Sequence, residues 1–186
     1  EVSGIFEMSG GMISNCQVGG WGGVVRSDGS MTMTGGTIRD NVEYRYTSVA
    51  HPIGVDVRGG TFALSGGTIS APGENAIPVN GGTLSLSGTP TLIGSVFLGS
   101  GRVIRVTDEG DDAFAGLVNL SLSAYTAGTQ VLTNTSGTFS PETLALFTLS
   151  APGWIIDTAG RLQVDEAVSV TAGGTTTVYG TLEDAM

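Results

Sequence analysis

The chain has 186 residues and a mass of 18.8 kDa, a size that favours one domain or one elongated repeat array with a small appendage. Hydrophobic residues make up 40% of the chain and charged residues 13%, which excludes an intrinsically disordered protein, because disorder needs low hydrophobicity and dense charge. The formal net charge is -10, so the protein would repel nucleic-acid backbones and anionic membrane surfaces.

Single residue types exclude further chemistry. All seven basic residues are arginines, which excludes Schiff-base formation and a lysine general base. Cys16 is the only cysteine, so an internal disulfide and a thiolate metal site are excluded, and no cofactor is predicted. No apolar run approaches the ~20 residues of a membrane span, so no membrane insertion is predicted within this chain. Because the chain begins at Glu1 without a signal-like segment, we interpret it as a processed product or a piece of a longer protein.

A glycine-rich repeat organises the first half of the chain. The 31 glycines occur mostly as Gly-Gly pairs without a three-residue period, which excludes collagen and predicts tight turns between short strands. Four segments share the pattern Gly-x-apolar-x-apolar-Ser/Thr-Gly-Gly-Thr-Ile, although the fourth departs from it at Thr89-Pro90. They begin 25, 31 and 22 residues apart, at Gly4, Gly29, Gly60 and Gly82. These spacings indicate a unit of roughly 22 residues that carries insertions.

Within each repeat, apolar and polar residues alternate, which is the pattern of a β-strand with one buried face. The sequence contains no amphipathic helical pattern of the length that an α/β fold needs. We therefore predict a parallel β-solenoid over residues 1–106, with each coil ~4.8 Å above the last. Cys16 occupies the slot of Asn41 one repeat later, which predicts a half-buried corner residue. Equivalent apolar residues should form three buried columns: Phe6, Met31, Phe62 and Leu84; Met8, Met33, Leu64 and Leu86; and Ile13, Ile38 and Ile69.

Residues 107–186 are predicted to form a β-rich continuation of the coils or a small β domain. A β-hairpin is expected over residues 154–164, and a short helical turn at Pro141-Glu-Thr-Leu. Further strands are predicted at residues 117–122, 130–132, 144–149, 168–170 and 175–179. The last two of these strands could begin another coil.

Three strings in the repeats carry a family resemblance: MSGGMISN (8–15), MTGGTIRDN (33–41) and LSGGTIS (64–70). They resemble the "MSGGTISGN" repeats of large bacterial surface proteins with right-handed parallel β-helix, pectin-lyase-like folds, many of which are described as adhesin-like. The segment 125–162 is similar to the region that often follows such repeats. The resemblance implies a non-enzymatic cell-surface or secreted protein of a bacterium, with an adhesin-like, scaffold or stalk role. A host surface protein or glycan is the partner that this implies.

Two alternatives to this role stay open. The first is a glycan-processing β-helix enzyme, which would need a pair of facing carboxylates. The dense acidic cluster Asp108, Glu109, Asp111 and Asp112 has no second acid in register on the neighbouring repeats, so we predict no catalytic residues. A solvated loop is the favoured interpretation of the cluster, with weak Ca²⁺ binding as the alternative. The second is a self-assembling filament, because truncated coils leave unpaired strand edges that allow head-to-tail association.

The insertion between the second and third repeats is the predicted ligand-binding element. It contains Tyr44, Arg45, Tyr46 and the only histidine, His51, which we interpret as a surface loop residue. Tyrosine and arginine contribute most to binding interfaces and stack on sugar rings. We predict that Tyr44, Arg45 and Tyr46, with Trp21 from the preceding insertion, form a recognition patch. The alternative is a lid in which the tyrosines pack against the coil.

Overall fold

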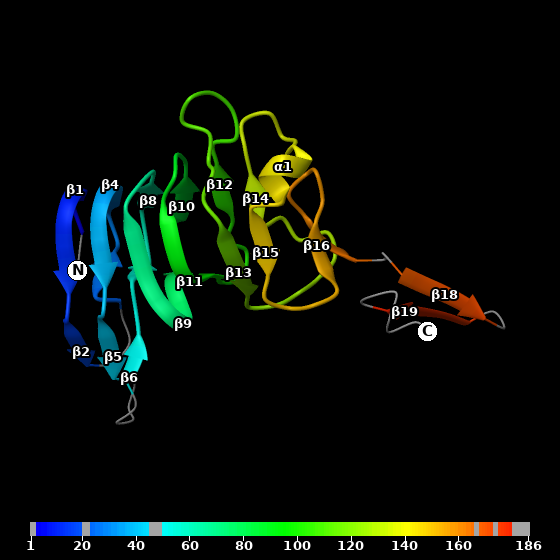
Figure 1. Cartoon of the computed structure of the whole chain (residues 1–186), viewed down its shortest axis with the longest axis horizontal. Coiled ribbons are helices and arrows are strands. Elements are labelled where there is room, and N and C mark those ends of the chain that lie inside the picture. Colours follow the sequence, from blue (N-terminus) through cyan, green and yellow to red (C-terminus); the bar gives the residue numbers. More distant parts are fainter. Residues whose placement is uncertain (1–2, 20–22, 45–49, 166–167, 173–174, 180–186) are drawn as a thin grey trace.

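The computed structural model describes residues 3–19, 23–44, 50–165, 168–172 and 175–179. The protein is all-β, with 53% of residues in strands. The largest element is a 12-stranded sheet whose strand pairs are all parallel and which curls into a half-barrel (Figure 1). Parallel pairing was the expectation from the repeats, and the sheet confirms it.

One ladder of this sheet joins the strands that open each repeat, in the order β1-β4-β8-β10-β12-β14. In its register, each residue of one row pairs with the next residue of that row on the neighbouring strand. The row runs through Phe6, Met31, Phe62, Leu84, Ile104 and Leu132. The residues predicted to form the first two columns are therefore neighbours across the ladder. The strands are β1 (Ile5–Ser14), β4 (Ser30–Arg39), β8 (Thr61–Leu64), β10 (Thr83–Leu86), β12 (Ile104–Val106) and β14 (Leu132–Thr133).

A second ladder runs through the later part of each repeat. Strand β9 bends between the two ladders, since Ile69 pairs with Ile38 of β4 while Val79 pairs with Val57 of β7. Phe62, Ile69 and the residues stacked on them are buried where the curled sheet faces itself. The strands of this part are β3 (Val25–Ser27), β7 (Val55–Val57), β9 (Thr68–Val79), β11 (Thr91–Leu98), β13 (Val118–Leu122) and β15 (Phe147–Leu149). The sheet thus continues past residue 106.

Two positive-φ glycines, Gly36 inside β4 and Gly67 between β8 and β9, show why the bends of the repeats need this residue. Gly36 has φ 89° and Gly67 has φ 83°, a left-handed conformation that side chains with a Cβ adopt only at a cost. The same conformation occurs at Asn15 and Asp40, which directly follow the ends of β1 and β4 at equivalent corners of the first two repeats. Asn41 follows that corner and joins the first two repeats, because its Nδ2 donates to the Ile13 carbonyl at 3.0 Å and its Oδ1 accepts from the Cys16 amide at 3.0 Å. Cys16 is half-buried, as its place in the repeat predicts.

A small three-stranded sheet projects from the stack at the N-terminal end (Figure 1). It holds β2 (Gln17–Gly19), β5 (Val42–Tyr44) and β6 (Ala50–Pro52), and β5 pairs with β2 in parallel and with β6 antiparallel. The predicted insertion therefore includes a strand pair that leaves the core.

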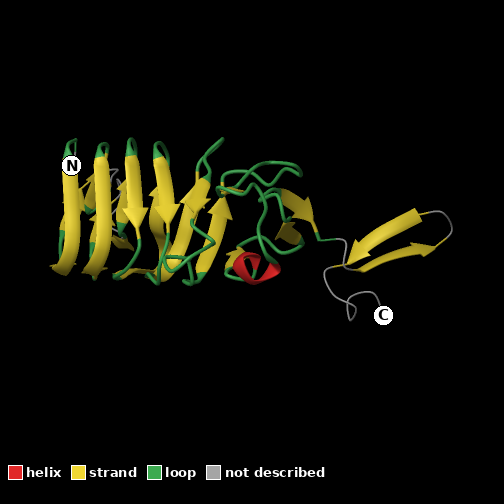
Figure 2. Cartoon of the chain, turned by 90° about the horizontal axis from the view of Figure 1, so that it is seen from above, coloured by secondary structure: helices red, strands yellow, loops and turns green. Residues whose placement is uncertain are grey.

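The C-terminal part changes to antiparallel pairing. The predicted hairpin is confirmed as β16 (Trp154–Ile156) and β17 (Leu162–Val164), and the predicted helical turn as α1 (Pro141–Leu144). Trp154 packs against Tyr125 with ring centroids 5.7 Å apart, while Leu162 is fully buried, so this end of the core is covered (Figure 2). Strands β18 (Val168–Ala172) and β19 (Thr175–Tyr179), which could have begun a coil, pair antiparallel with each other as a hairpin.

Candidate binding surface

A row of polar residues crosses four strands on the outer face of the second ladder. The register places Asn75 of β9, Ser95 of β11, Asn119 of β13 and Thr148 of β15 side by side. Alternate residues of the same strands, such as Val96, are buried in the core, so the polar row lies on the opposite face. Parallel strands lie ~4.8 Å apart, which makes the row a regular track of hydroxyl and amide groups.

Hydrogen bonds hold the two asparagine side chains of this row. Ser95 Oγ donates to Asn75 Oδ1 at 2.8 Å, and Ser121 Oγ donates to the same oxygen at 3.2 Å. On the next strand, Ser150 Oγ donates to Asn119 Oδ1 at 2.9 Å. Since both amide oxygens are acceptors within the protein, the two Nδ2 groups are the parts of these side chains that can donate to a ligand. Of these two amides, Asn119 belongs to the groove described next.

Ser95, Asn119 and Thr148 of this row line a groove of about 530 Å³, which we call the polar groove. Its wall includes one strongly exposed apolar side chain, Leu117, at 71% exposure. An apolar wall that faces positioned polar groups is the usual composition of a ligand site. The polar and larger apolar side chains of its lining include Glu74, Leu92, Ser95, Leu117, Asn119 and Thr148.

Glu74 is the one carboxylate among the residues that line the polar groove. Hydrolysis of a glycosidic bond typically uses two carboxyl groups, about 5–5.5 Å apart in retaining enzymes and about 6.5–9.5 Å apart in inverting ones. The groove lining has no second Asp or Glu for that pair. The groove can therefore hydrogen-bond a polar ligand, but it lacks the usual pair of glycosidase groups.

A second groove, of about 500 Å³, lies on the outer face of the first ladder. Ser85 of β10, Arg105 of β12 and Thr133 of β14 follow one another in register along it. Asn134 at its rim is used within the protein, because its Nδ2 donates to Asp108 Oδ2 at 2.6 Å and its Oδ1 accepts from the Gly137 amide at 2.7 Å. This groove has a guanidinium and hydroxyl groups but fewer free amide donors than the polar groove.

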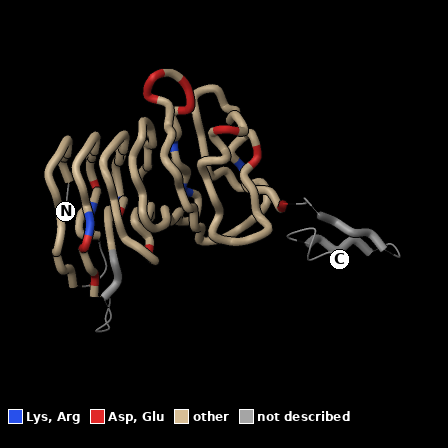
Figure 3. The backbone as a smooth tube through the Cα atoms, viewed as in Figure 1, with Lys and Arg blue, Asp and Glu red and all other residues tan. Residues whose placement is uncertain are grey.

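The predicted acidic cluster lies in the loop between β12 and β13, which rises above the stack (Figure 3). Asp108 is half-buried and bound by Asn134, whereas Glu109, Asp111 and Asp112 are exposed. The carbonyl oxygen of Asp112 accepts from the Gly88 amide at 2.8 Å, which anchors the far side of the loop. Across the described ranges, no group of three or more His, Cys, Asp or Glu side chains is placed to hold a metal ion.

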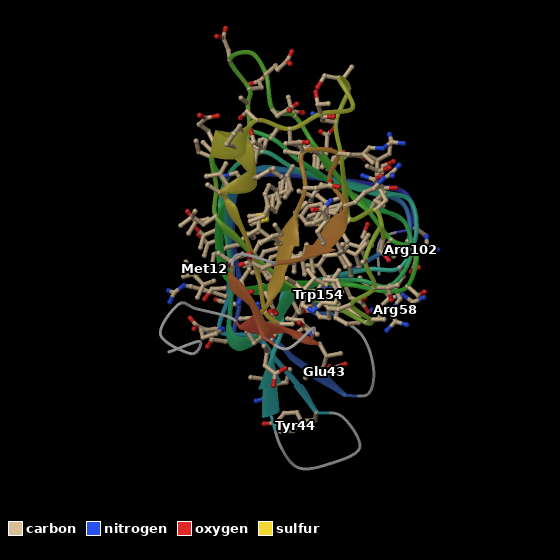
Figure 4. The ribbon with its side chains drawn as sticks, turned by 90° about the vertical axis from the view of Figure 1, so that its right-hand side faces the viewer. Met12, Glu43, Tyr44, Arg58, Arg102 and Trp154 are labelled. Atoms are coloured by element: carbon tan, nitrogen blue, oxygen red, sulfur yellow. The ribbon has the colours of Figure 1, made fainter. Side chains whose placement is uncertain are left out.

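Of the predicted recognition patch, the structure describes Tyr44. Its side chain is 37% exposed and lies on the projecting sheet, away from the core (Figure 4). The preceding residue, Glu43, is buried, so the two neighbours face opposite sides of β5. Trp21, Arg45 and Tyr46 lie outside the described residues, so whether the patch forms stays a prediction. His51 pairs with Glu43 through the backbone of β6.

The polar groove was not predicted from the sequence. Asn75, Ser95 and Asn119 are 20 and 24 residues apart, and none of them belongs to the Gly-Gly motif that aligned the repeats. A weak signal exists, because each precedes an alternating apolar strand segment by one or two residues. Only the pairing of the strands brings these three side chains into one row.

Comparison with known proteins gives no match to a family model, to a curated protein or to a solved structure. Among the described residues, no helix is both long enough and apolar enough to span a membrane.

Proposed function

We propose that this chain is a right-handed parallel β-helix module of a bacterial cell-surface or secreted protein, with an adhesin-like, non-enzymatic role. In this role the polar groove binds a glycan of a host surface. The observation that carries the proposal is that Ser95 and Asn119, whose side chain Ser150 holds, line one groove with the exposed Leu117. Glycans present many hydroxyl groups and apolar ring faces, which suit amide donors next to an apolar wall.

The β-helix part of the proposal rests on the strand connections. β4 and β8 are parallel neighbours, and the chain between them passes through β7, which belongs to the other ladder. Crossover connections between parallel strands of one sheet are right-handed in about 98% of cases. Successive units that repeat this connection would form the coils of a right-handed β-helix. The resemblance of the Gly-Gly strings to bacterial surface repeats supports the same fold.

A repeat architecture whose outer faces carry grooves and loops supports the proposed surface role. A stack of coils is a semi-rigid support, since each coil is bound to its neighbours along the whole strand. Both grooves and the projecting sheet lie on the outside of this support. We assign no catalytic residue, because the polar groove offers Glu74 without the second carboxylate of a glycosidase.

A glycan array followed by calorimetry on the best ligand tests this proposal. Asn119→Ala and Leu117→Ala should each weaken binding at least tenfold, which corresponds to about 1.4 kcal/mol. Both side chains are exposed, so the melting temperature should stay within about 2 °C of the parent value. The matched control is Met12→Ala, which also removes an exposed apolar side chain but at the opposite end of the stack.

Three results would contradict the proposal. Equal affinity of the parent and the two groove variants would exclude the polar groove. Loss of binding in the combined Tyr44→Ala, Arg45→Ala, Tyr46→Ala variant, with the groove variants unchanged, would move the site to the predicted recognition patch. Release of reducing ends or unsaturated uronates from the bound glycan would establish an enzyme instead.

A further inference from the structure

The two ends of the strand stack differ in how they are covered. At the C-terminal end, the β16–β17 hairpin covers the core. At the N-terminal end, β1 is the outermost strand and, in the part of the chain that the structure describes, it pairs with β4 alone (Figure 2). One edge of β1 therefore presents backbone donors and acceptors that are available for pairing.

The column of Phe6 ends at this strand without a covering layer, while Met8, which ends the second column, is 7% exposed. Phe6 is half-buried, whereas its column neighbour Met31 is 1% exposed. Ile5 and Met12 on the same strand are 81% and 56% exposed. The end of the column at Phe6 is thus an apolar surface beside a strand edge.

The inner coils show what the repeat glycines do. A Cβ on Gly35 would lie 2.5 Å from the carbonyl oxygen of Ser9, and a Cβ on Gly67 would lie 2.7 Å from the carbonyl oxygen of Gly36. A Cβ on Gly29 would meet the carbonyl oxygen of Gly4 even more closely. At each of these positions the backbone of the preceding coil occupies the place that a side chain would need. Glycine is therefore required there by the coil stacked in front.

The first repeat has the same glycines, but within the described structure no strand of a preceding coil lies against them. Gly4 and Gly10 are the counterparts of Gly29 and Gly35, and no atom lies within 4 Å of a Cβ built on either one. Neither residue has a φ in the left-handed region, so the backbone conformation does not require glycine either. Within the described structure, the glycine motif of the first repeat has a surface fitted for close approach but no contact that uses it.

We propose that the outer face of β1 is a docking surface for one further parallel coil of the same Gly-x-apolar-x-apolar-Ser/Thr-Gly-Gly repeat. Carbonyl oxygens of that coil lie over Gly4 and Gly10, and its apolar residues extend the Phe6 and Met8 columns. The added coil would pair with β1 in parallel, in the same way that β1 pairs with β4. The covered C-terminal end does not provide such a coil, so head-to-tail stacking of a second copy is not the proposed occupant. This inference does not depend on glycan binding.

The test is a chain lengthened by one of its own coils. A second copy of residues 60–81 is inserted directly before Gly4, so that the copied coil leads into the first repeat as the original leads into Gly82. The expected results are a higher midpoint of urea unfolding and slower hydrogen exchange of the β1 backbone amides. The matched control inserts the same segment with serine at the positions copied from Phe62 and Leu64, and it should give neither gain.

A glycine substitution distinguishes a stacked coil from a merely attached one. Gly10→Ala should leave the unfolding midpoint of the parent unchanged, because no atom opposes the added methyl group. In the lengthened chain the same substitution should lower the midpoint, as Gly35→Ala does in the parent.

Two sets of results would overturn the proposal. The first is an inserted coil that stays unprotected against exchange, or a Gly10→Ala effect that is equal in both chains. The second is a dimer of the parent, measured by light scattering over a concentration series, that disappears in the lengthened chain. That dimer would assign the face to a second copy of the protein.

Discussion

The column through Phe62 allows one repeat position to be compared in two settings. Phe62 is fully buried between Met31 and Leu84, whereas Phe6 holds the same position in the outermost strand and is half-buried. Phe62→Ala removes a ring with neighbours on both sides and leaves a cavity, which costs about 3–5 kcal/mol. Phe6→Ala loses about half of that contact and leaves no closed cavity, so about 1–2 kcal/mol is expected.

Urea unfolding followed by the β-sheet signal in circular dichroism measures both costs. With a slope of about 2 kcal/mol per molar urea, Phe62→Ala should lower the midpoint by about 1.5–2.5 M and Phe6→Ala by about 0.5–1 M. The total stability of such domains is about 5–15 kcal/mol, so both variants should still fold. Equal shifts for the two variants would refute the argument, because they would mean that the number of neighbouring strands does not decide how much this side chain contributes to stability.

Two further predictions concern single polar contacts. Asp56 is buried, accepts from Arg58 Nε at 2.6 Å and from Asn80 Nδ2 at 3.1 Å, so Asp56→Ala should cost about 1–3 kcal/mol in urea unfolding. Asp28→Ala is its control, since the Arg26–Asp28 pair at 2.7 Å is partly exposed and should contribute about 0–1 kcal/mol; equal costs would contradict this reasoning. Hydrogen bonds from the backbone amide of Glu142 and from the Ser140 hydroxyl lower the pKa of the Glu142 carboxyl. The stability that this carboxylate contributes is therefore fully present above its unfolded pKa, and it is lost as the pH falls through the lower folded pKa. Ser140→Ala should raise that pKa towards its ordinary value, and an unchanged NMR titration of Glu142 would contradict the assignment.

The strand register of the first ladder could be predicted from the sequence because its signals are local. Phe6, Met31, Phe62 and Leu84 each stand two residues after the glycine that opens a repeat. The side-chain period of a strand is two, so a slip of one residue would turn every apolar side chain of that strand to solvent. The motif and the alternation therefore specify the same pairing, and the structure has it.

The polar groove could not be predicted because it depends on contacts between strands that no motif relates. One row contains Asn75, Ser95 and Asn119 only because β9 bends from the first ladder into the second, where β11 pairs with β9 and β13 pairs with β11. The hairpin of β18 and β19 is a similar case, since two short strands can pair with each other or start a coil with the same local sequence.

By itself, the sequence determined that the fold is all-β, that the strands of the repeats pair in parallel, and most of the residues of the buried core. These features depend on alternation and on glycines at fixed offsets, which act over a few residues. Tertiary structure alone decided where the sheet bends, which polar side chains share a groove, and that one end of the stack is covered while β1 is open at the other. These depend on non-local packing, because their residues are distant in sequence and become neighbours only when the strands pair into the sheet.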